Sequence, residues 1–389
     1  MSNCYTFYAQ QIEMSNRILH AFTGERELYG ILLAQMQSGK SGTYYRLALE
    51  AVHQGFFESV CIICGSRDTA LREQTKVGLT RAIKSFAREQ TTDIDTYEQM
   101  VEHFNQVINV YWNQELKSVS IGDKCLIIND ESHTAQSKDN VPFRKFWAKN
   151  GLSACLHGDT TSLLAREIRV LSVSATSFSE CVENQRVALG IESRHVLSSK
   201  NVFIMDPGPT YTGVADFLDR DDGYGIKFTA KPINAQTRGA HLHNILLDEK
   251  YANKYCIVRT ARAELDAHLV EDIATRAGVG YIPVHGEHIK DTLAFMSTPP
   301  TNGTKLVHIC GIARMGQELD KTHVGFVYEQ SPTPQIDTLL QGLLGRACGH
   351  NTNTEMDIFI SAKREREVRE YAGYDFDAYL KEFGKVLNG

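Results

Sequence analysis

The sequence has few prolines and tryptophans, and it has no long apolar run. Its 389 residues include 9 prolines and 2 tryptophans, with 42% hydrophobic and 23% charged residues. No apolar stretch approaches the ~20 residues that a membrane-spanning helix needs, so we expect no membrane partner. The composition excludes a disordered chain, a collagen and a small disulfide scaffold. It is typical of a globular protein, and the length favours two or three domains.

The sequence also has no excess of positive charge. Asp and Glu number 47 against 41 Lys and Arg, which gives a net charge of −6. Proteins that coat nucleic acid without specificity usually carry a strong positive excess, so a nucleic-acid partner would need a local basic track here. The 9 cysteines are odd in number and most lie in apolar runs. They indicate buried thiols in a reducing compartment, and we expect no secretory signal and a cytoplasmic location.

Apolar, β-branched runs alternate with helical patterns along the chain. Strands are predicted at 29–35, 60–65, 107–111, 125–129 and 170–175, and again at 255–260, 281–285, 306–310, 323–328 and 356–361. Helices are predicted at 42–53, 69–88, 142–149, 261–277, 336–344 and 363–387. This alternation predicts an α/β fold with mostly parallel sheets flanked by helices. Turn-forming residues at 206–209 and 219–225 indicate a connector between two such domains.

The strongest local motif is Ala34-Gln35-Met36-Gln37-Ser38-Gly39-Lys40-Ser41, which follows an apolar strand and begins a helix. This is the context of a phosphate-binding loop, in which backbone N–H groups surround the phosphates. Lys40 would reach the β- and γ-phosphates, and the Ser41 hydroxyl would ligate Mg²⁺. We therefore expect ATP and Mg²⁺ as cofactors. The expected nucleotide contacts are Gln37, Ser38, Gly39, Lys40, Ser41 and Gly42.

Two adjacent carboxylates, Asp130 and Glu131, follow the apolar strand at 125–129. In a doubly wound sheet, ligands bind beyond the carboxyl ends of the strands, which would bring Asp130 beside the loop. Asp130 would hold Mg²⁺, and Glu131 would position and deprotonate the attacking water. His133 could relay between the nucleotide and the other domain. Loop and acidic pair together predict an ATPase.

The motifs that accompany the loop make the chain resemble a superfamily 2 helicase of the DExH type, with two RecA-like domains. The residues Asp130-Glu131-Ser132-His133 resemble the DExH box, and Ser174-Ala175-Thr176 resembles the motif that couples hydrolysis to domain movement. Further stretches match the family's motifs in order, at 61–67, 71–74, 255–260, 285–286, 309–321 and 337–349. Parts of 65–75 and 337–346 also resemble ATPases of phage and restriction-linked systems. The phage resemblance would imply a viral protein that acts in the host cell, and the restriction-linked resemblance is the alternative.

The resemblance implies roles for further residues. Arg346 would be the arginine finger, with Arg314 and Arg259 as alternatives, although the motif's second arginine falls on Gly349 or His350. Ser174 and Thr176 would act with His133 in coupling. Gln11, or Gln10 in its place, would read the adenine edge. Further nucleotide contacts would be Gly316 and Gln341, and the nucleic-acid contacts would be Ser66, Arg67, Arg259, Thr260 and Gly311.

The resemblance also implies a domain organisation and a function. We expect an ATP-binding RecA-like domain at 1–200, a connector or small insertion at 201–250, a second RecA-like domain at 251–362 and a helical extension at 363–389. The expected activity is that of a monomeric ATP-dependent translocase or helicase, acting on DNA or, as the second choice, on RNA. The alternative is an ATP-switched interaction module, with protein partners in a defence or replication assembly and no strand separation.

Overall fold

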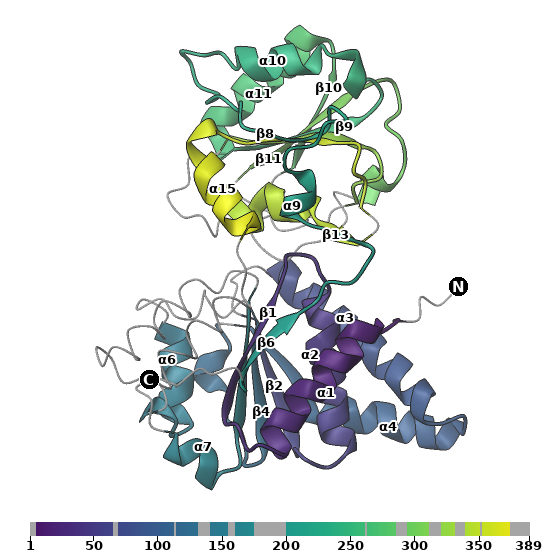
Figure 1. Ribbon diagram of the computed structural model, residues 1–389, viewed down its shortest axis with the longest axis vertical. Coiled ribbons are helices and arrows are strands. Elements are labelled where there is room, and N and C mark those ends of the chain that lie inside the picture. The colour runs from purple at the N-terminus through teal and green to yellow at the C-terminus, as the bar shows by residue number, and fades with distance from the viewer. Residues whose placement is uncertain are drawn as a thin grey trace. The chain divides into compact units, whose positions relative to one another are not determined.

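The computed structural model describes residues 5–64, 69–112, 114–130, 141–154, 160–174, 200–260, 263–284, 294–310, 320–330, 339–350 and 352–373. These residues form two compact units (Figure 1). The first contains the residues up to Gly208 apart from Met36–Ser38, and the second contains Met36–Ser38 and the residues from Pro209 onward. Each unit has its own sheet and its own apolar core.

The first unit is built on a six-stranded parallel sheet with the strand order β3-β2-β4-β5-β1-β6. Its strands are β1 (Tyr29–Ala34), β2 (Ser59–Cys64), β3 (Ile108–Trp112), β4 (Cys125–Asp130), β5 (Arg169–Ser174) and β6 (Val202–Met205). All six strands point the same way, so their carboxyl ends lie along one edge of the sheet. The carboxyl ends of β1 and β4 lie on either side of β5.

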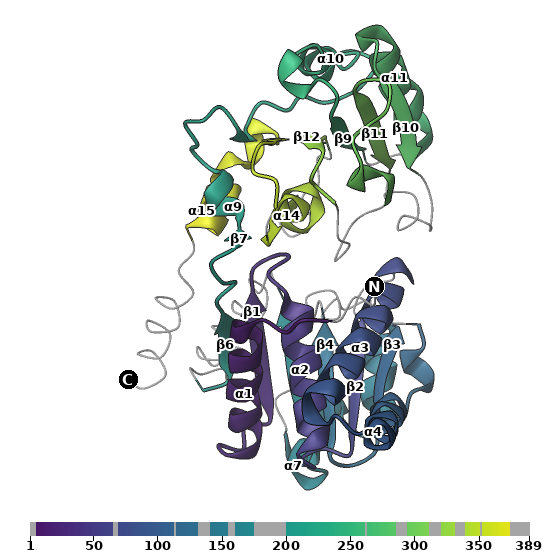
Figure 2. The ribbon, with the colours of Figure 1, turned by 90° about the vertical axis from the view of Figure 1, so that its right-hand side faces the viewer.

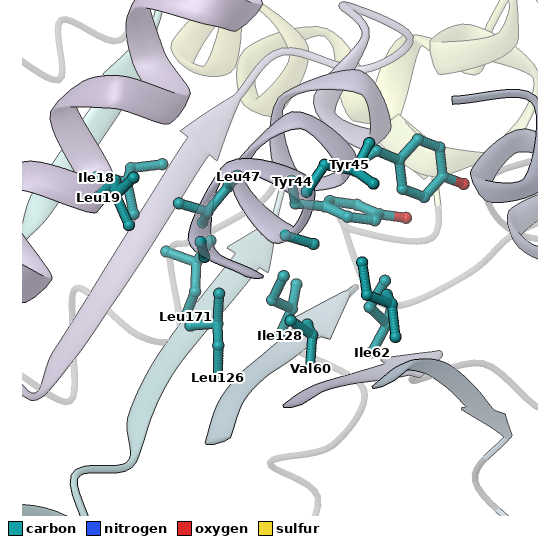
Figure 3. Packing of buried hydrophobic residues seen from close by; sticks show 14 of the residues in the cluster. Ile18, Leu19, Tyr44, Tyr45, Leu47, Val60, Ile62, Leu126, Ile128 and Leu171 are labelled. Atoms are coloured by element: carbon teal, nitrogen blue, oxygen red, sulfur yellow. The ribbon is translucent and has the colours of Figure 1, made fainter. Parts of the chain in front are cut away.

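Helices cover both faces of this sheet (Figure 1). They are α1 (Ala9–Thr23), α2 (Lys40–His53), α3 (Thr69–Gln90) and α4 (Ile94–Val107) on one face, and α6 (Val141–Lys149) and α7 (Thr161–Ala165) on the other. A strand buried on both faces has a nearly continuous apolar run. In β4, Leu126 and Ile128 pack with α2 in one core (Figure 3). Cys125 and Ile127 pack with α6 in another.

The second unit is built on another six-stranded parallel sheet, with the order β10-β11-β9-β12-β14-β8. Its strands are β8 (Gly225–Lys227), β9 (Tyr255–Thr260), β10 (Gly280–Val284), β11 (Lys305–Cys310), β12 (Val324–Glu329) and β14 (Asp357–Phe359). A short antiparallel ribbon pairs β7 (Tyr211–Thr212) with β13 (Gly349–His350). The helices are α9 (Val214–Phe217), α10 (Ala240–Leu246), α11 (Ala263–Ala277), α14 (Gly345–Ala347) and α15 (Glu365–Ala372), and Figure 2 shows them from a second side.

Single helical turns complete the described chain. They are the 3₁₀ turns Leu116–Ser118, Glu249–Tyr251, Ala294–Ser297 and Ala362–Arg364, and the π-helical turn Leu340–Leu344, which leads into α14. No helix among the described residues is long and apolar enough to cross a membrane.

The predicted fold class is confirmed, because both units are α/β with parallel sheets flanked by helices. All ten predicted strands are present, with ends that differ by a few residues at most. The segment expected as a connector contributes more than a linker does. Within 201–250, β6 forms an edge of the first sheet and β8 forms an edge of the second.

Candidate nucleotide-binding site

The loop between β1 and α2 has the backbone geometry of an anion-binding turn. The strand ends at Ala34 and the helix begins at Lys40. Gly39 lies between them with φ +90°, a conformation that glycine adopts without the strain of a Cβ atom. The first N–H groups of a helix have no partner within the helix and carry its partial positive charge, so the start of α2 is suited to phosphate.

The side chains predicted to contact the phosphates lie along this turn. Lys40 and Ser41 are half-buried in the first turn of α2, and Gly42 follows them in the buried interior. Ser38 is fully buried, and Gln37 has a left-handed φ of +58°. The last two residues are grouped with the second compact unit.

Gln11 in α1 is bound to the loop itself. Its Nε2 donates to the carbonyl oxygen of Gly39 at 2.9 Å, and its Oε1 accepts from the backbone N–H of Tyr8 at 3.0 Å. The side chain is only 2% exposed. The amide thus links the start of α1 to the start of α2. The alternative residue, Gln10, donates to the carbonyl oxygen of Pro207 at 3.1 Å. The adenine-reading role of either glutamine stays a prediction.

Asp130 lies at the carboxyl end of β4 and is 5% exposed. Its Oδ2 accepts a hydrogen bond of 3.0 Å from the hydroxyl of Tyr44, which lies one turn into α2. Burial raises the pKa of the Tyr44 phenol well above its ordinary value, and the charge of Asp130 adds to the rise. A side-chain hydrogen bond from Ser41 opposes that rise in pKa. Ser174, fully buried, ends β5 between the two strands that carry the loop and Asp130.

The residues at this edge fit Mg²⁺ better than a soft metal. Asp130 and Ser41 offer a carboxylate and a hydroxyl, and Mg²⁺ is typically bound by one or two carboxylates, with waters and substrate phosphates completing its shell. Among the described residues, no group of three or more His, Cys, Asp or Glu could hold a metal. Cys61 and Cys64 are buried, as expected, and burial raises the pKa of Cys64 to about 12. Neither thiol therefore supplies a thiolate.

Two residues of the second unit that were predicted to contact nucleic acid lie within its packed sheet. Arg259 is 4% exposed at the end of β9, and its Nε lies 3.0 Å from Oε2 of Glu329 at the end of β12. Thr260 is 1% exposed, with its hydroxyl 2.8 Å from Nε2 of His308. This burial favours a structural role for both side chains, and contact with nucleic acid stays a prediction. Arg346, the finger candidate, is 3% exposed in α14.

Of the remaining predicted residues, Gln341 lies in the π-helical turn. The other eight lie outside the described residues, namely Ser66, Arg67, Glu131, His133, Thr176, Gly311, Arg314 and Gly316.

Sequence reasoning missed three buried polar side chains, one in α2 and two in the second sheet. Tyr44 follows Lys40 by four residues, so the helical repeat places both on one face of α2, and that spacing could have revealed it. Glu329 directly follows a predicted apolar strand, as Asp130 does. His308 lies inside β11, where no local pattern identifies its partners.

Comparison with known proteins shows that the fold of this chain is similar to that of several solved structures. No protein-family model matches the chain, and no curated protein matches it. Among solved structures, S. cerevisiae Dbp5 bound to RNA and ADP BeF3 matches with a TM-score of 0.53 at 13% identity, over 96% of this chain and 93% of that one. The DEAD-box helicase Mss116 bound to ssRNA and UDP-BeF matches with a TM-score of 0.58 at 12% identity, over 99% and 78%.

A third similar structure is the ATP-dependent Type ISP restriction-modification enzyme LlaBIII bound to DNA. It matches with a TM-score of 0.58 at 14% identity, over 92% of this chain and 28% of that one. This chain therefore spans little more than a quarter of that enzyme. At these identities the likeness shows the fold alone, which is a tandem pair of RecA-like domains.

Proposed function

We propose that this protein is an ATP-dependent nucleic-acid translocase or helicase. The observation that carries the proposal is the arrangement at the edge of the first sheet. A glycine-containing turn leads into α2, which has Lys40 and Ser41 in its first turn. Asp130 ends β4, and its carboxylate accepts a hydrogen bond from Tyr44 of the same helix. The fold, shared with nucleic-acid motors, supports the choice of polymer over a small-molecule phosphate acceptor.

In the proposed reaction each side chain of this edge has one task. The start of α2 and Lys40 bind the phosphates and offset their charge. Ser41 and Asp130 would hold the Mg²⁺ that neutralises charge on the β- and γ-phosphates. Glu131, the residue after Asp130, would orient the attacking water and accept its proton, and Arg346 would offset charge in the transition state. These residue roles follow from the interpretation of the sequence as that of a DExH-type ATPase.

A polymer partner is proposed by analogy with the similar structures. Two of them are described as bound to RNA and one as bound to DNA. We propose DNA first, because the Type ISP enzyme resembles the restriction-linked systems suggested by the sequence. Contacts to phosphates would make binding weaken as salt is raised, since each contact releases condensed counterions.

The test is ATP hydrolysis with and without single-stranded, duplex and branched DNA and RNA at low salt. We expect stimulation by at least one polymer. Lys40→Ala and Glu131→Gln should each reduce turnover by at least a hundredfold while the fold is retained. The matched control is Lys84→Ala, which removes an exposed lysine from α3 and should leave turnover unchanged.

Two outcomes would contradict the proposal. Retained turnover in Lys40→Ala or Glu131→Gln would remove the role assigned to that residue. Hydrolysis that no polymer stimulates, together with no polymer binding at low salt, would favour the ATP-switched interaction module. A strand-displacement assay on the purified protein then separates a helicase from a translocase that moves without separating strands.

A further inference from the structure

Tyr44 joins the two elements that carry the candidate Mg²⁺ ligands, helix α2 and strand β4. It follows Ser41 by three residues, so the two side chains are neighbours on the surface of α2. Its hydroxyl donates to Oδ2 of Asp130 at 3.0 Å. The phenol thus ties the carboxylate at the end of β4 to the helix that carries Ser41.

The ring that carries this hydroxyl is held rigidly. Tyr44 is fully buried in the core of the first unit, above Ile128 and Ile62 (Figure 3). It packs edge-to-face against Tyr45, with ring centroids 4.8 Å apart and an interplanar angle of 79°. A tyrosine has only two side-chain torsions, so this packing determines where the hydroxyl points.

Asp130 needs such a donor. A carboxylate that is 5% exposed has lost most of its hydration, and this loss is costly unless hydrogen bonds replace the water. A donor on one carboxylate oxygen also selects one rotation of the carboxyl group, because its two oxygens are no longer equivalent. The second carboxylate oxygen, Oδ1, is then held in one fixed direction.

We propose that Tyr44 is a positioning residue that fixes the Asp130 carboxylate relative to the Ser41 hydroxyl for binding of Mg²⁺ together with nucleotide. The inference rests on the proposed function. Tyr44 acts through Asp130 and touches neither substrate nor metal. If the tyrosine were only a core residue with a satisfied hydroxyl, its removal would change stability and leave the response to Mg²⁺ unaltered.

The test compares nucleotide binding with and without Mg²⁺ in the full chain, by calorimetric titration with AMPPNP in EDTA and in a series of MgCl₂ concentrations. Tyr44→Phe keeps the ring and removes the hydroxyl. We expect Mg²⁺-free affinity to stay within about twofold of the native value. The half-saturating Mg²⁺ concentration should rise on the order of tenfold, as expected for loss of a hydrogen bond to a charged group. Electron paramagnetic resonance of bound Mn²⁺ gives a second readout that needs no catalysis.

Tyr45→Phe is the matched control, because it removes a buried hydroxyl from the next residue of the same helix. That hydroxyl donates to the carbonyl oxygen of Thr75 at 3.0 Å, whereas the hydroxyl that donates to the Asp130 carboxylate belongs to Tyr44. We expect its Mg²⁺ response to equal that of the native chain. In an Asp130→Ala background, Tyr44→Phe should have no further effect on the Mg²⁺ response.

The outcomes separate this inference from the proposed function. An unchanged or tighter Mg²⁺ response in Tyr44→Phe, with nucleotide binding intact, overturns the role of Tyr44 alone. A Mg²⁺ effect of equal size in Tyr45→Phe would also overturn it, because the effect would then come from general loosening of α2. If the native chain binds no AMPPNP under any condition, the proposed function fails.

Discussion

At the scale of single residues, Gly42 is constrained by a neighbour that is distant in sequence. A Cβ atom built on Gly42 would lie 2.4 Å from Nε2 of Gln11, and one built on Gly39 would lie 2.5 Å from the same atom. The amide of Gln11 therefore occupies the space that these two glycines leave open. The absence of side chains at both positions lets α1 approach the loop and hydrogen-bond to it.

We predict that Gly42→Ala acts mainly by displacing Gln11. The new methyl group would push the flexible end of that side chain away and break its 2.9 Å hydrogen bond to the carbonyl of Gly39. Loss of a buried hydrogen bond lowers the free energy of unfolding by about 1–3 kcal/mol. The loop should also hold phosphate less well, with nucleotide affinity reduced several-fold. Urea denaturation and calorimetric titration measure the two effects.

Gln11→Ala and the double variant complete this test. Because Gly42→Ala and Gln11→Ala would remove the same interaction, their combined effect should fall well short of the sum of the single effects. A control is Gly55→Ala, since a Cβ atom at Gly55 meets nothing within 4 Å, although its φ of +72° adds backbone strain. Additive effects of Gly42→Ala and Gln11→Ala would show that the two residues act independently.

At the scale of helices and strands, local patterns predicted the elements that are buried on both faces. β2 and β4 are apolar at nearly every position and were found from sequence, whereas β6 and β8 were not. These two strands have four and three residues, and they lie at sheet edges next to turn-forming stretches. Such short strands are stabilised by pairing with a neighbour, which a local pattern does not contain.

The candidate site also contains parts that local sequence patterns predicted and parts that they did not. The loop around Lys40 and the carboxylate of Asp130 are local motifs, and the sequence predicted both. Their hydrogen bonds, from Gln11 to Gly39 and from Tyr44 to Asp130, join residues 28 and 86 positions apart, and no spacing rule predicts contacts at such separations. Those pairings follow from how α1, α2 and β4 pack, which the sequence specifies only through the whole core.

The ion pair between β9 and β12 gives a prediction at this scale. Arg259 and Glu329 have side chains that are 5% and 2% exposed, with Nε and Oε2 3.0 Å apart. We predict that Arg259→Met lowers the free energy of unfolding of the second unit by about 3–5 kcal/mol, because it leaves a buried carboxylate without its cation. Chemical denaturation followed by far-ultraviolet circular dichroism measures the change.

Two further variants identify the cause. Adding Glu329→Leu to Arg259→Met should recover much of the lost stability, since apolar side chains tolerate the site better than one unpaired charge. Arg366→Met breaks the exposed ion pair between Arg366 and Glu370, in which the two side chains are 84% and 64% exposed. It should lower the free energy of unfolding by less than about 1 kcal/mol. A double variant no more stable than Arg259→Met would mean that packing, and not the unpaired charge, causes the loss.

At the scale of the whole molecule, the net charge of −6 is compatible with the proposed function. A translocating enzyme must release its polymer in every cycle, so a narrow basic track would suffice and a net positive charge would not be required. The scarcity of tryptophan is more useful. The two tryptophans of the chain, Trp112 and Trp147, both lie in the first unit, in β3 and α6.

Tryptophan fluorescence should therefore report unfolding of the first unit alone, while far-ultraviolet circular dichroism reports both units. We predict that AMPPNP with Mg²⁺, at about 100 times its dissociation constant, stabilises the folded first unit by about 2.7 kcal/mol. The thermal transition seen by fluorescence should rise by several degrees in the native chain. In Lys40→Ala, which would bind phosphate poorly, it should stay fixed. A shift seen equally in Lys40→Ala would mean that nucleotide binds elsewhere. A shift absent from the native chain would contradict the assignment of the site to this unit.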